Sequence, residues 1–496
     1  MSIRLWIDVE DLFDYARGNR RPSGIQRLAF EIYRALQQRL GDSGLMQFVR
    51  HDVPRNSFRI VSWSEVAGLF EGLTDLEPAP APVLPSGITP RPPARRFMGK
   101  WLHRLAPSLR PLVIQAVLAQ GEALRAWGTI ARAICLELRN RLRRVMRLSR
   151  SASVRECPPT ETTAFTADAF AEHSAPGDVI LVLGSPWSHP DYAALVSHQR
   201  ERGLRFALLV YDLIPIRRPE WCDRGLVRLF RDWFQTVLPL CDVVFAISQA
   251  TASDVELYAR DGKILLPGPV QAIPIGTGFG APPTLSGASI KHALPRAGSY
   301  ALFVSTIEAR KNHVLLFRVW RQLLEDMQED QVPTLVFAGR VGWMVGDLMH
   351  QIANTDHLAG KLVVIEDPTD TELAELYRGC LFTLFPSFYE GWGLPVTESL
   401  AFGKPCIISN RTSLPEAGGA LARTFDPDNL HDAYQVIRTT IEDRSDLARW
   451  ERRVRQEFQP VSWSRTADAI LTGLCFSAED APFGRNNVRL ESIPAS

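Results

Sequence analysis

The stretch FPSFYEGWGLPVTESLAFGKP, residues 385–405, places Glu390 and Glu398 eight residues apart, with a Gly-Trp-Gly turn and Pro395 between them. The apolar residues before it predict a strand that ends at Pro386, and Pro395 favours the first turn of a helix. Open parallel sheets bind ligands at the carboxyl ends of their strands. The stretch therefore predicts a binding site in the loop between this strand and this helix.

The two glutamates and the helix start would contact different parts of one ligand. The free N–H groups and the positive dipole end of the helix favour a phosphate. Glu398 would lie about one turn into the helix, and the glycines let the backbone approach closely. Ionised carboxylates are pure acceptors and bind hydroxyls well. One loop–helix unit would thus hold a diphosphate on its backbone, with a carboxylate at each end for sugar hydroxyls.

Composition indicates a folded protein of two or three domains, because the chain has 496 residues, 46% hydrophobic and 22% charged. A formal net charge of +1 gives no reason to expect nucleic acid as a partner. The seven cysteines are odd in number and form no C-x-x-C pair, which fits a reducing compartment rather than a disulfide framework or metal knuckle. The acidic N-terminus MSIRLWIDVEDLF is unlike a signal peptide, and no apolar run is long enough to span a membrane as a helix.

Apolar strand-like runs alternate with amphipathic helical stretches, and the alternation restarts after a Gly/Pro-rich linker at 276–298. Alternating strands and helices imply parallel sheets covered on both faces, and the restart implies two such domains facing one another. Strands are predicted at 3–9, 179–183, 206–211, 243–247, 301–304, 334–338, 362–365, 381–384 and 406–408, and helices at 25–40, 226–238, 251–258, 312–327, 371–379 and 395–402.

One segment, 75–155, does not fit this alternation. Its first part, 75–93, is proline-rich and reads as an extended linker. Residues 91–155 then hold fifteen Lys or Arg against two Glu, an excess of +13, interleaved with tryptophans and aliphatic residues. That mixture is typical of interfacial helices on an anionic membrane. The alternative is a solvated basic insertion packed on the surface.

The full motif F-Y-E-G-W-G-L-P-x-x-E-S-L-A-x-G-x-P resembles the E-x7-E motif of retaining glycosyltransferases of family GT4, glycosyl transferases group 1. The resemblance covers most of 290–475, is thin in the N-terminal half and is missing from 75–155. Segments in the family's order are FVSTIEARKNHVLLFRVW (303–320), LVFAGR (335–340), SLPEAGGALARTFDPDN (413–429) and VSWSRTADAIL (461–471), with SGIQR (23–27), VYDLIPIRRPEW (210–221) and AISQATASDV (246–255) upstream.

This resemblance implies a GT-B fold, an α/β architecture of two facing Rossmann-like domains with a cleft between them. Residues 1–285 would form the N-terminal acceptor-binding domain, with the basic helical insertion at 75–155. Residues 286–460 would form the domain that binds the nucleotide sugar, and 461–496 a C-terminal helix that crosses back to the first domain.

The resemblance also implies roles for the residues of the motif. Glu390 would bind hydroxyls of the donor sugar, and Glu398 would bind the ribose of the nucleotide. Main-chain N–H groups of Gly393 and Leu394 would lie against the phosphates, with Gly391 in the same glycine turn. The alternative is that the two glutamates are a turn residue and part of a solvated helix face.

Lys311 and Arg310 would neutralise the diphosphate leaving group, because cations placed where charge develops stabilise it. Relatives often have an arginine at the positions that are 305–306 in this chain. Since this chain has Ser and Thr there, Arg310 alone would supply the arginine that neutralises the diphosphate. Gly24 would lie in a loop where the backbone approaches the phosphates, or would be an N-cap. Asp212 would be catalytic or would cap a turn; relatives often have His-Asp where this chain has Tyr-Asp.

Other acidic residues have weaker claims to a role. Asp8 and Glu10 near the first strand end would be structural or would face the acceptor. Glu416 is expected to be structural. The D-x-D at 426–428 resembles a metal motif but follows a late strand, so this stretch is expected to be a helix cap. We expect neither a metal nor another cofactor.

The expected activity is retaining transfer of a hexose from a nucleotide-diphospho sugar, with GDP-mannose the leading donor and UDP-sugars second. The acceptor would be a polysaccharide or lipid-linked glycan of the bacterial surface, and the enzyme would be cytoplasmic and peripheral on the inner face of the cell membrane. One rival is a non-catalytic GT-B protein that binds a nucleotide sugar or glycan. A nicotinamide or flavin enzyme would need G-x-G-x-x-G after a strand, and IDVEDLFDYARG follows the first one instead.

Overall fold

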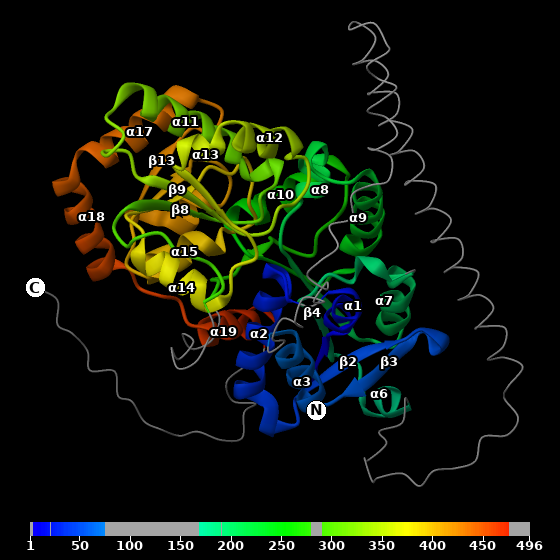
Figure 1. The fold of residues 1–496 in the computed structure, drawn as a ribbon. Coiled ribbons are helices and arrows are strands. Elements are labelled where there is room, and N and C mark those ends of the chain that lie inside the picture. The colour runs from blue at the N-terminus through cyan, green and yellow to red at the C-terminus, as the bar shows by residue number, and fades with distance from the viewer. Residues whose placement is uncertain (1–2, 20, 75–167, 190, 279–289, 476–496) are drawn as a thin grey trace, which may run out of the picture. The chain divides into compact units, whose positions relative to one another are not determined.

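The computed structural model describes residues 3–19, 21–74, 168–189, 191–278 and 290–475, which form two parallel sheets flanked by helices (Figure 1). The predicted basic insertion at 75–155 lies outside these residues. The expected fold class, α/β with two Rossmann-like sheets, is confirmed. Within the described residues, none of the helices combines the length and apolar character needed to cross a bilayer.

The first sheet has seven strands in the order β3-β2-β1-β4-β5-β6-β7, all parallel except for the antiparallel pair β2 and β3. Its central strands β1, β4, β5 and β6 are largely apolar and buried because helices cover both faces of the sheet. Leu5 and Ile7 of β1 belong to the core on one face, and Trp6 belongs to the core on the other. The strands are β1 (Leu5–Asp8), β2 (Met46–Asp52), β3 (Ser57–Val61), β4 (Val179–Val182), β5 (Arg205–Val210), β6 (Val243–Ala246) and β7 (Gln271–Ala272).

The helices around the first sheet bury one apolar stripe each. In α9, Val227, Phe230, Phe234 and Val237 recur at helical spacing and are buried against this sheet. The helices are α1 (Glu10–Gly18), α2 (Gly24–Leu40), α3 (Trp63–Thr74), α6 (Asp168–His173), α7 (Tyr192–Glu201), α8 (Ile214–Arg217), α9 (Arg224–Val237) and α10 (Gln249–Asp261), with 3-10 turns η1 (Gly41–Ser43), η2 (Val53–Arg55), η3 (Pro186–Ser188), η4 (Pro219–Trp221) and η5 (Leu238–Leu240).

The second sheet has six strands in the order β10-β9-β8-β11-β12-β13, all parallel. Its strands are β8 (Tyr300–Val304), β9 (Thr334–Ala338), β10 (Leu362–Ile365), β11 (Thr383–Phe385), β12 (Cys406–Ser409) and β13 (Ala422–Phe425). Around it lie η6 (Ala309–Lys311), α11 (His313–Asp326), α12 (Gly346–Asn354), α13 (Asp356–Ala359), α14 (Asp370–Gly379), α15 (Leu394–Ala401), α16 (Leu414–Gly418), η7 (Gly419–Leu421), α17 (Leu430–Glu442) and α18 (Arg444–Glu457).

The last described helix, α19 (Trp463–Gly473), lies beside α2 of the first sheet (Figure 1). Ala467 and Ile470 join the apolar core of that sheet. Asp468 pairs with Arg39 of α2 at 2.6 Å. The chain thus leaves the second sheet after α18 and ends its described part on the first.

The strands and helices predicted from the sequence are all present, with ends shifted by at most three residues. Strands β2 and β3 were not predicted, because polar residues such as Gln47 and Arg50 interrupt their apolar pattern. They form because β2 pairs with β1 in parallel, and Arg50 finds a buried partner in Glu10. Tertiary contacts therefore decide this edge of the sheet.

Candidate active site

The motif forms the expected strand–loop–helix unit at the carboxyl edge of the second sheet. Strand β11 ends at Phe385, and α15 begins at Leu394 with Pro395 as its second residue. Gly393 precedes the helix with φ at +109°, a backbone conformation that favours glycine. Neither the N–H of Gly393 nor that of Leu394 donates a hydrogen bond to any residue within the described ranges. These two groups remain available to an anion.

The loop before α15 lies against the carboxyl end of β5 in the first sheet. A Cβ on Gly391 would come within 2.2 Å of the carbonyl oxygen of Tyr211, so this position admits no side chain without a shift of the backbone. The hydroxyl of Thr251, on α10, donates to the carbonyl of Gly391 at 3.3 Å. Tyr389 donates to the carboxylate of Asp254 on the same helix. The glycine turn therefore brings the ends of two sheets together at the site.

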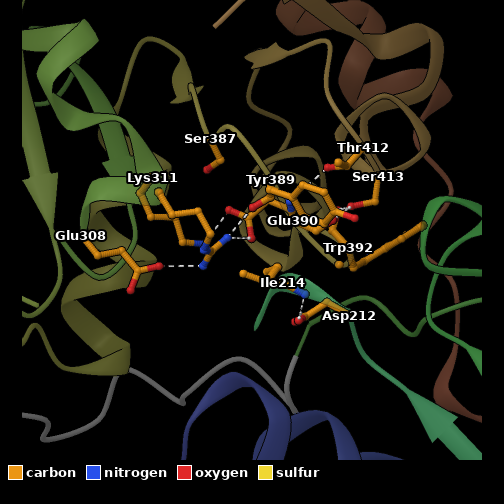
Figure 2. Close-up of polar contacts among 12 residues, drawn as sticks. Asp212, Ile214, Glu308, Lys311, Ser387, Tyr389, Glu390, Trp392, Thr412 and Ser413 are labelled. Carbon is orange, nitrogen blue, oxygen red and sulfur yellow. Dashed lines mark hydrogen bonds and ion pairs between the residues drawn. The ribbon is translucent and has the colours of Figure 1, made fainter. Parts of the chain in front are cut away.

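Glu390 holds two cations at once. One carboxylate oxygen lies 2.6 Å from Nζ of Lys311 and the other 2.9 Å from Nη1 of Arg310. Figure 2 shows Lys311 and Glu390 pointing toward one another. The Glu390 side chain is only 12% exposed. Its N–H donates to Oγ1 of Thr412 at 3.0 Å, and its carbonyl accepts from the Ser413 hydroxyl at 3.0 Å. The interpretation of Glu390 as an ordinary turn residue does not fit this geometry.

The electrostatics of the cluster keep Glu390 ionised. Burial alone would raise the pKa of Glu390, but the charges of Arg310 and Lys311 lower it to about 2. Burial lowers the pKa of the Lys311 ammonium, and Arg310 lowers it further, while Glu390 opposes both. The two cations of the cluster face two carboxylates, Glu390 and Glu308, so an incoming anion would have to take the place of a carboxylate.

Glu308 is a site residue that the sequence reasoning missed. Its carboxylate lies 2.7 Å from Nη2 of Arg310 and is 4% exposed. Arg310 is thus held between Glu308 and Glu390, and these two carboxylates raise its pKa although burial opposes the rise. The signal in the sequence was an acid two residues before the arginine. Lys311 and Arg310 lie in the turn η6 rather than at a helix start, since α11 begins at His313.

Asp212 follows β5 and caps the turn there, accepting from the N–H of Ile214 at 2.9 Å. It also lies close enough to Arg310, Lys311 and Glu390 for their charges to act on it. Burial raises the pKa of Asp212, and the two cations oppose that rise. The turn-cap interpretation is therefore confirmed, and a role in the site remains a proposal.

Glu398 lies one turn into α15 as expected, and its partners differ from those of Glu390. The phenol of Tyr377 donates to its Oε2 at 2.9 Å. Burial raises the pKa of Glu398, while Tyr377 and the charge of Arg27 lower it. Arg27 itself pairs with Asp370 at 3.1 Å. The two glutamates of the motif thus occupy separate polar environments at opposite ends of the loop–helix unit.

Gly24 does not lie in a loop, as one prediction had it, nor is it the N-cap. It is the first residue of α2, and Ser23 occupies the N-cap position. An added Cβ would lie 3.9 Å from Cδ1 of Leu394, an ordinary van der Waals distance. The start of α2 and the start of α15 therefore approach each other.

Two further predictions about acidic residues have different outcomes. Glu416 is structural as expected, because it accepts the N–H groups of Gln249 and Ala250 at the start of α10 at 2.7 and 2.8 Å. The prediction that the stretch 426–428 is a helix cap is wrong. Asn429 is the N-cap of α17. The carboxylates of the D-x-D instead pair with Arg411, at 2.8 and 3.1 Å.

Asp8 and Glu10 form a buried polar cluster at the end of β1. Asp8 accepts from the phenol of Tyr192 and contacts Nε2 of His51, both at 2.7 Å. Glu10 makes a bidentate pair with Arg50 at 2.6 and 2.9 Å. Both acids are thus paired within the first sheet, which supports the structural interpretation of each. His51 and Arg50 come from β2, a strand that the sequence did not reveal.

Comparison with known proteins confirms the family resemblance for the second part of the chain. Residues 289–457 match the family model described as glycosyl transferases group 1. The chain is 26% identical over 311 residues to the serotype-specific mannosyltransferase WbdA of Escherichia coli, covering 60% of this chain and 37% of WbdA. It is 34% identical over 146 residues to the O-antigen chain mannosyltransferase B of Escherichia coli, covering 29% and 38%. The chain therefore spans less than two fifths of these relatives.

Among solved structures, the crystal structure of TarM superposes with a TM-score of 0.46 and 12% identity, covering 60% of this chain and 55% of TarM.

Proposed function

We propose that this chain is a retaining glycosyltransferase that moves a hexose from a nucleotide-diphospho sugar to a glycan acceptor. The observation that supports it best is the cluster of Arg310 and Lys311 around Glu390, in the loop that leads to the unpaired N–H groups of Gly393 and Leu394 at the start of α15. Cations and a helix dipole at one point stabilise a diphosphate. The family match over 289–457 agrees with this chemistry.

In this proposal the diphosphate of the bound donor replaces Glu390 as the partner of Lys311 and Arg310. A diphosphate carries more negative charge than one carboxylate, so it would draw Lys311 and Arg310 toward its oxygens. Glu390 would then turn a free oxygen to hydroxyls of the donor sugar. Glu308 would keep Arg310 in place, since it binds the other side of the guanidinium at 2.7 Å. Arg310 would therefore be positioned before the donor arrives.

The transfer step needs no covalent intermediate on the protein. The acceptor hydroxyl oxygen attacks the anomeric carbon on the face that the leaving diphosphate departs from. The bond between that carbon and the phosphate oxygen breaks, and the departing phosphate oxygen takes the hydroxyl proton. Lys311 and Arg310 stabilise the charge that develops on the leaving group. Asp212, near both cations, would face the same space from the first sheet.

The donor and acceptor are inferred from the names of the relatives. WbdA and the O-antigen chain mannosyltransferase are both mannosyltransferases. We therefore place mannose first as the sugar, GDP-mannose first as the donor and UDP-sugars second. The acceptor would be a growing bacterial surface glycan, bound by the part of the chain built on the first sheet. The basic segment 91–155 would hold the enzyme on an anionic membrane face beside a lipid-linked acceptor.

A panel of nucleotide sugars tests the donor. A bound donor raises the melting temperature of the purified protein, because it stabilises the folded state. GDP-mannose should give the largest rise. Release of nucleoside diphosphate in the presence of glycan acceptors then separates an enzyme from a protein that only binds. If the protein binds a nucleotide sugar but releases no nucleoside diphosphate with any of the glycan acceptors tried, the non-catalytic alternative is favoured.

A further inference from the structure

The hydrogen bond between Tyr377 and Glu398 joins two helices of the second sheet at one end of the site. Tyr377 lies on α14 and Glu398 on α15, and the phenol donates to Oε2 of the carboxylate at 2.9 Å. A longer contact of 3.5 Å runs from the same phenol to the carbonyl of Pro395. Tyr377 is 2% exposed, and its ring stacks on Phe402 with centroids 5.1 Å apart. The phenol therefore has little freedom to move.

The second oxygen of Glu398 has no such partner. Within the part of the chain that the structure describes, Oε1 takes no hydrogen bond. The other charged groups that act on this carboxylate are Arg27 of α2 and Asp370 of α14, and their side chains pair with each other. Glu398 thus has one oxygen, Oε2, held by Tyr377, and a second oxygen, Oε1, that is available to accept a hydrogen bond from a ligand.

We propose that Tyr377 is a positioning residue for nucleotide recognition, an inference that rests on the proposed function. Tyr377 holds the Glu398 carboxylate in the orientation in which Oε1 points at the ribose hydroxyls of the donor. A glutamate carboxylate, carried on three rotatable side-chain bonds, loses side-chain entropy when it binds a hydroxyl. A partner that fixes its orientation beforehand reduces that loss. Neighbouring ribose hydroxyls are donors, and an ionised carboxylate oxygen is a pure acceptor.

The role of Tyr377 predicts a specific defect rather than a general one. Tyr377→Phe keeps the ring that stacks on Phe402 and removes the phenol. The carboxylate then rotates freely and loses a hydrogen bond that lowers its pKa. Affinity for a nucleoside diphosphate should fall by about tenfold, the scale of one hydrogen bond to a charged group. The loss should depend on the ribose hydroxyls and on pH, because only an ionised Glu398 accepts from them.

The experiment measures the affinity of the full chain for GDP and for 2′,3′-dideoxy-GDP by calorimetry. The wild type should prefer GDP, and Tyr377→Phe should lose most of that preference. The ratio of the two affinities does not depend on the fraction of folded protein, so it stays informative if the variant is less stable. In Glu398→Gln, the preference should vanish, and adding Tyr377→Phe should change nothing further.

A matched control removes a different tyrosine–carboxylate bond. Tyr434 of α17 donates to Asp326 at 2.6 Å, and neither residue contacts Glu398. Tyr434→Phe should keep the wild-type preference for GDP. In the wild type, GDP affinity should fall as pH drops through the pKa of Glu398. In Tyr377→Phe that fall should begin at higher pH, because the phenol no longer favours the ionised carboxylate.

The outcomes separate the inference from the proposed function. If Glu398→Gln loses the preference for GDP and Tyr377→Phe keeps it, the positioning role of Tyr377 is wrong and the donor site stands. If Glu398→Gln keeps the preference, the assignment of Glu398 to the ribose is wrong, and the inference falls with it. If the wild type binds no nucleoside diphosphate when GDP and UDP are both tried, the proposed function itself fails.

Discussion

Replacing Glu390 with Gln removes one negative charge and leaves Arg310 and Lys311 without it in a buried cluster. The pKa of Glu390 is about 2 in the folded chain, against 4.5 as its ordinary value. Each pKa unit corresponds to about 1.4 kcal/mol, so the ionised carboxylate contributes about 3 kcal/mol to folding at pH 7. The side chain is 12% exposed, so solvent screens little of this energy.

The sign of the pH dependence follows from the lowered pKa. The stabilisation is fully present above the ordinary value of 4.5 and is lost as pH falls through about 2. At pH 3 about 1.4 kcal/mol of it should remain. Glu390→Gln should therefore be about 3 kcal/mol less stable than the wild type at pH 7, and the difference should shrink toward pH 3.

Urea unfolding of both proteins, followed by circular dichroism at pH 7, 5 and 3, measures this difference. The control is Glu442→Gln, which removes one acid of the exposed pair between Arg438 and Glu442. Exposed pairs contribute about 0–1 kcal/mol, so this variant should stay close to the wild type. Equal stability of Glu390→Gln and wild type at pH 7, or a difference that does not change with pH, would refute the reasoning.

Three other predictions concern activity and membrane binding. Lys311→Ala should lower kcat/KM by on the order of a hundredfold, as when other stabilisers of developing charge are removed. The control Lys404→Ala breaks a lysine–glutamate pair with Glu451 elsewhere and should leave kcat/KM unchanged. Equal effects of the two variants in steady-state assays would contradict the role assigned to Lys311. Transfer should continue in EDTA, because Lys311 and Arg310 supply the positive charge, and a strict need for Mg²⁺ or Mn²⁺ would overturn that mechanism. The full chain should co-sediment with anionic vesicles at low salt, detach as salt rises and ignore neutral vesicles; no binding to anionic vesicles would remove the membrane role proposed for 91–155.

The sequence predicted the parts of the site that lie within one short segment. In residues 385–405, the apolar run, the glycine turn and Pro395 fix a strand, a loop and a helix start by local rules of backbone geometry. The positions of Glu390 and Glu398 on this unit follow from that spacing. The alternation of strands and helices predicted parallel sheets for the same reason, because periodicity is a local property of the chain.

Contacts between distant segments could not be predicted in this way. Gly24 was expected in a loop or at an N-cap, but Ser23 takes the N-cap and the helix begins at Gly24. Glu308 and Tyr377 look like ordinary surface residues in the sequence, and burial reveals their partners. Strand β2 carries the polar residues Arg50 and His51, which fit in the sheet because Arg50 pairs with Glu10 and His51 contacts Asp8.

The sequence by itself determined the α/β class, the strand–loop–helix unit of the motif and the residue types that could bind a diphosphate. The tertiary structure alone decided which charges meet. Lys311 and Glu390 are 79 residues apart in the chain, and their contact at 2.6 Å exists because β8 and β11 are neighbours in one parallel sheet. Neighbouring parallel strands end at the same edge, so the loops that follow them converge. Electrostatic energy depends on distance and burial, and neither is set by spacing along the chain.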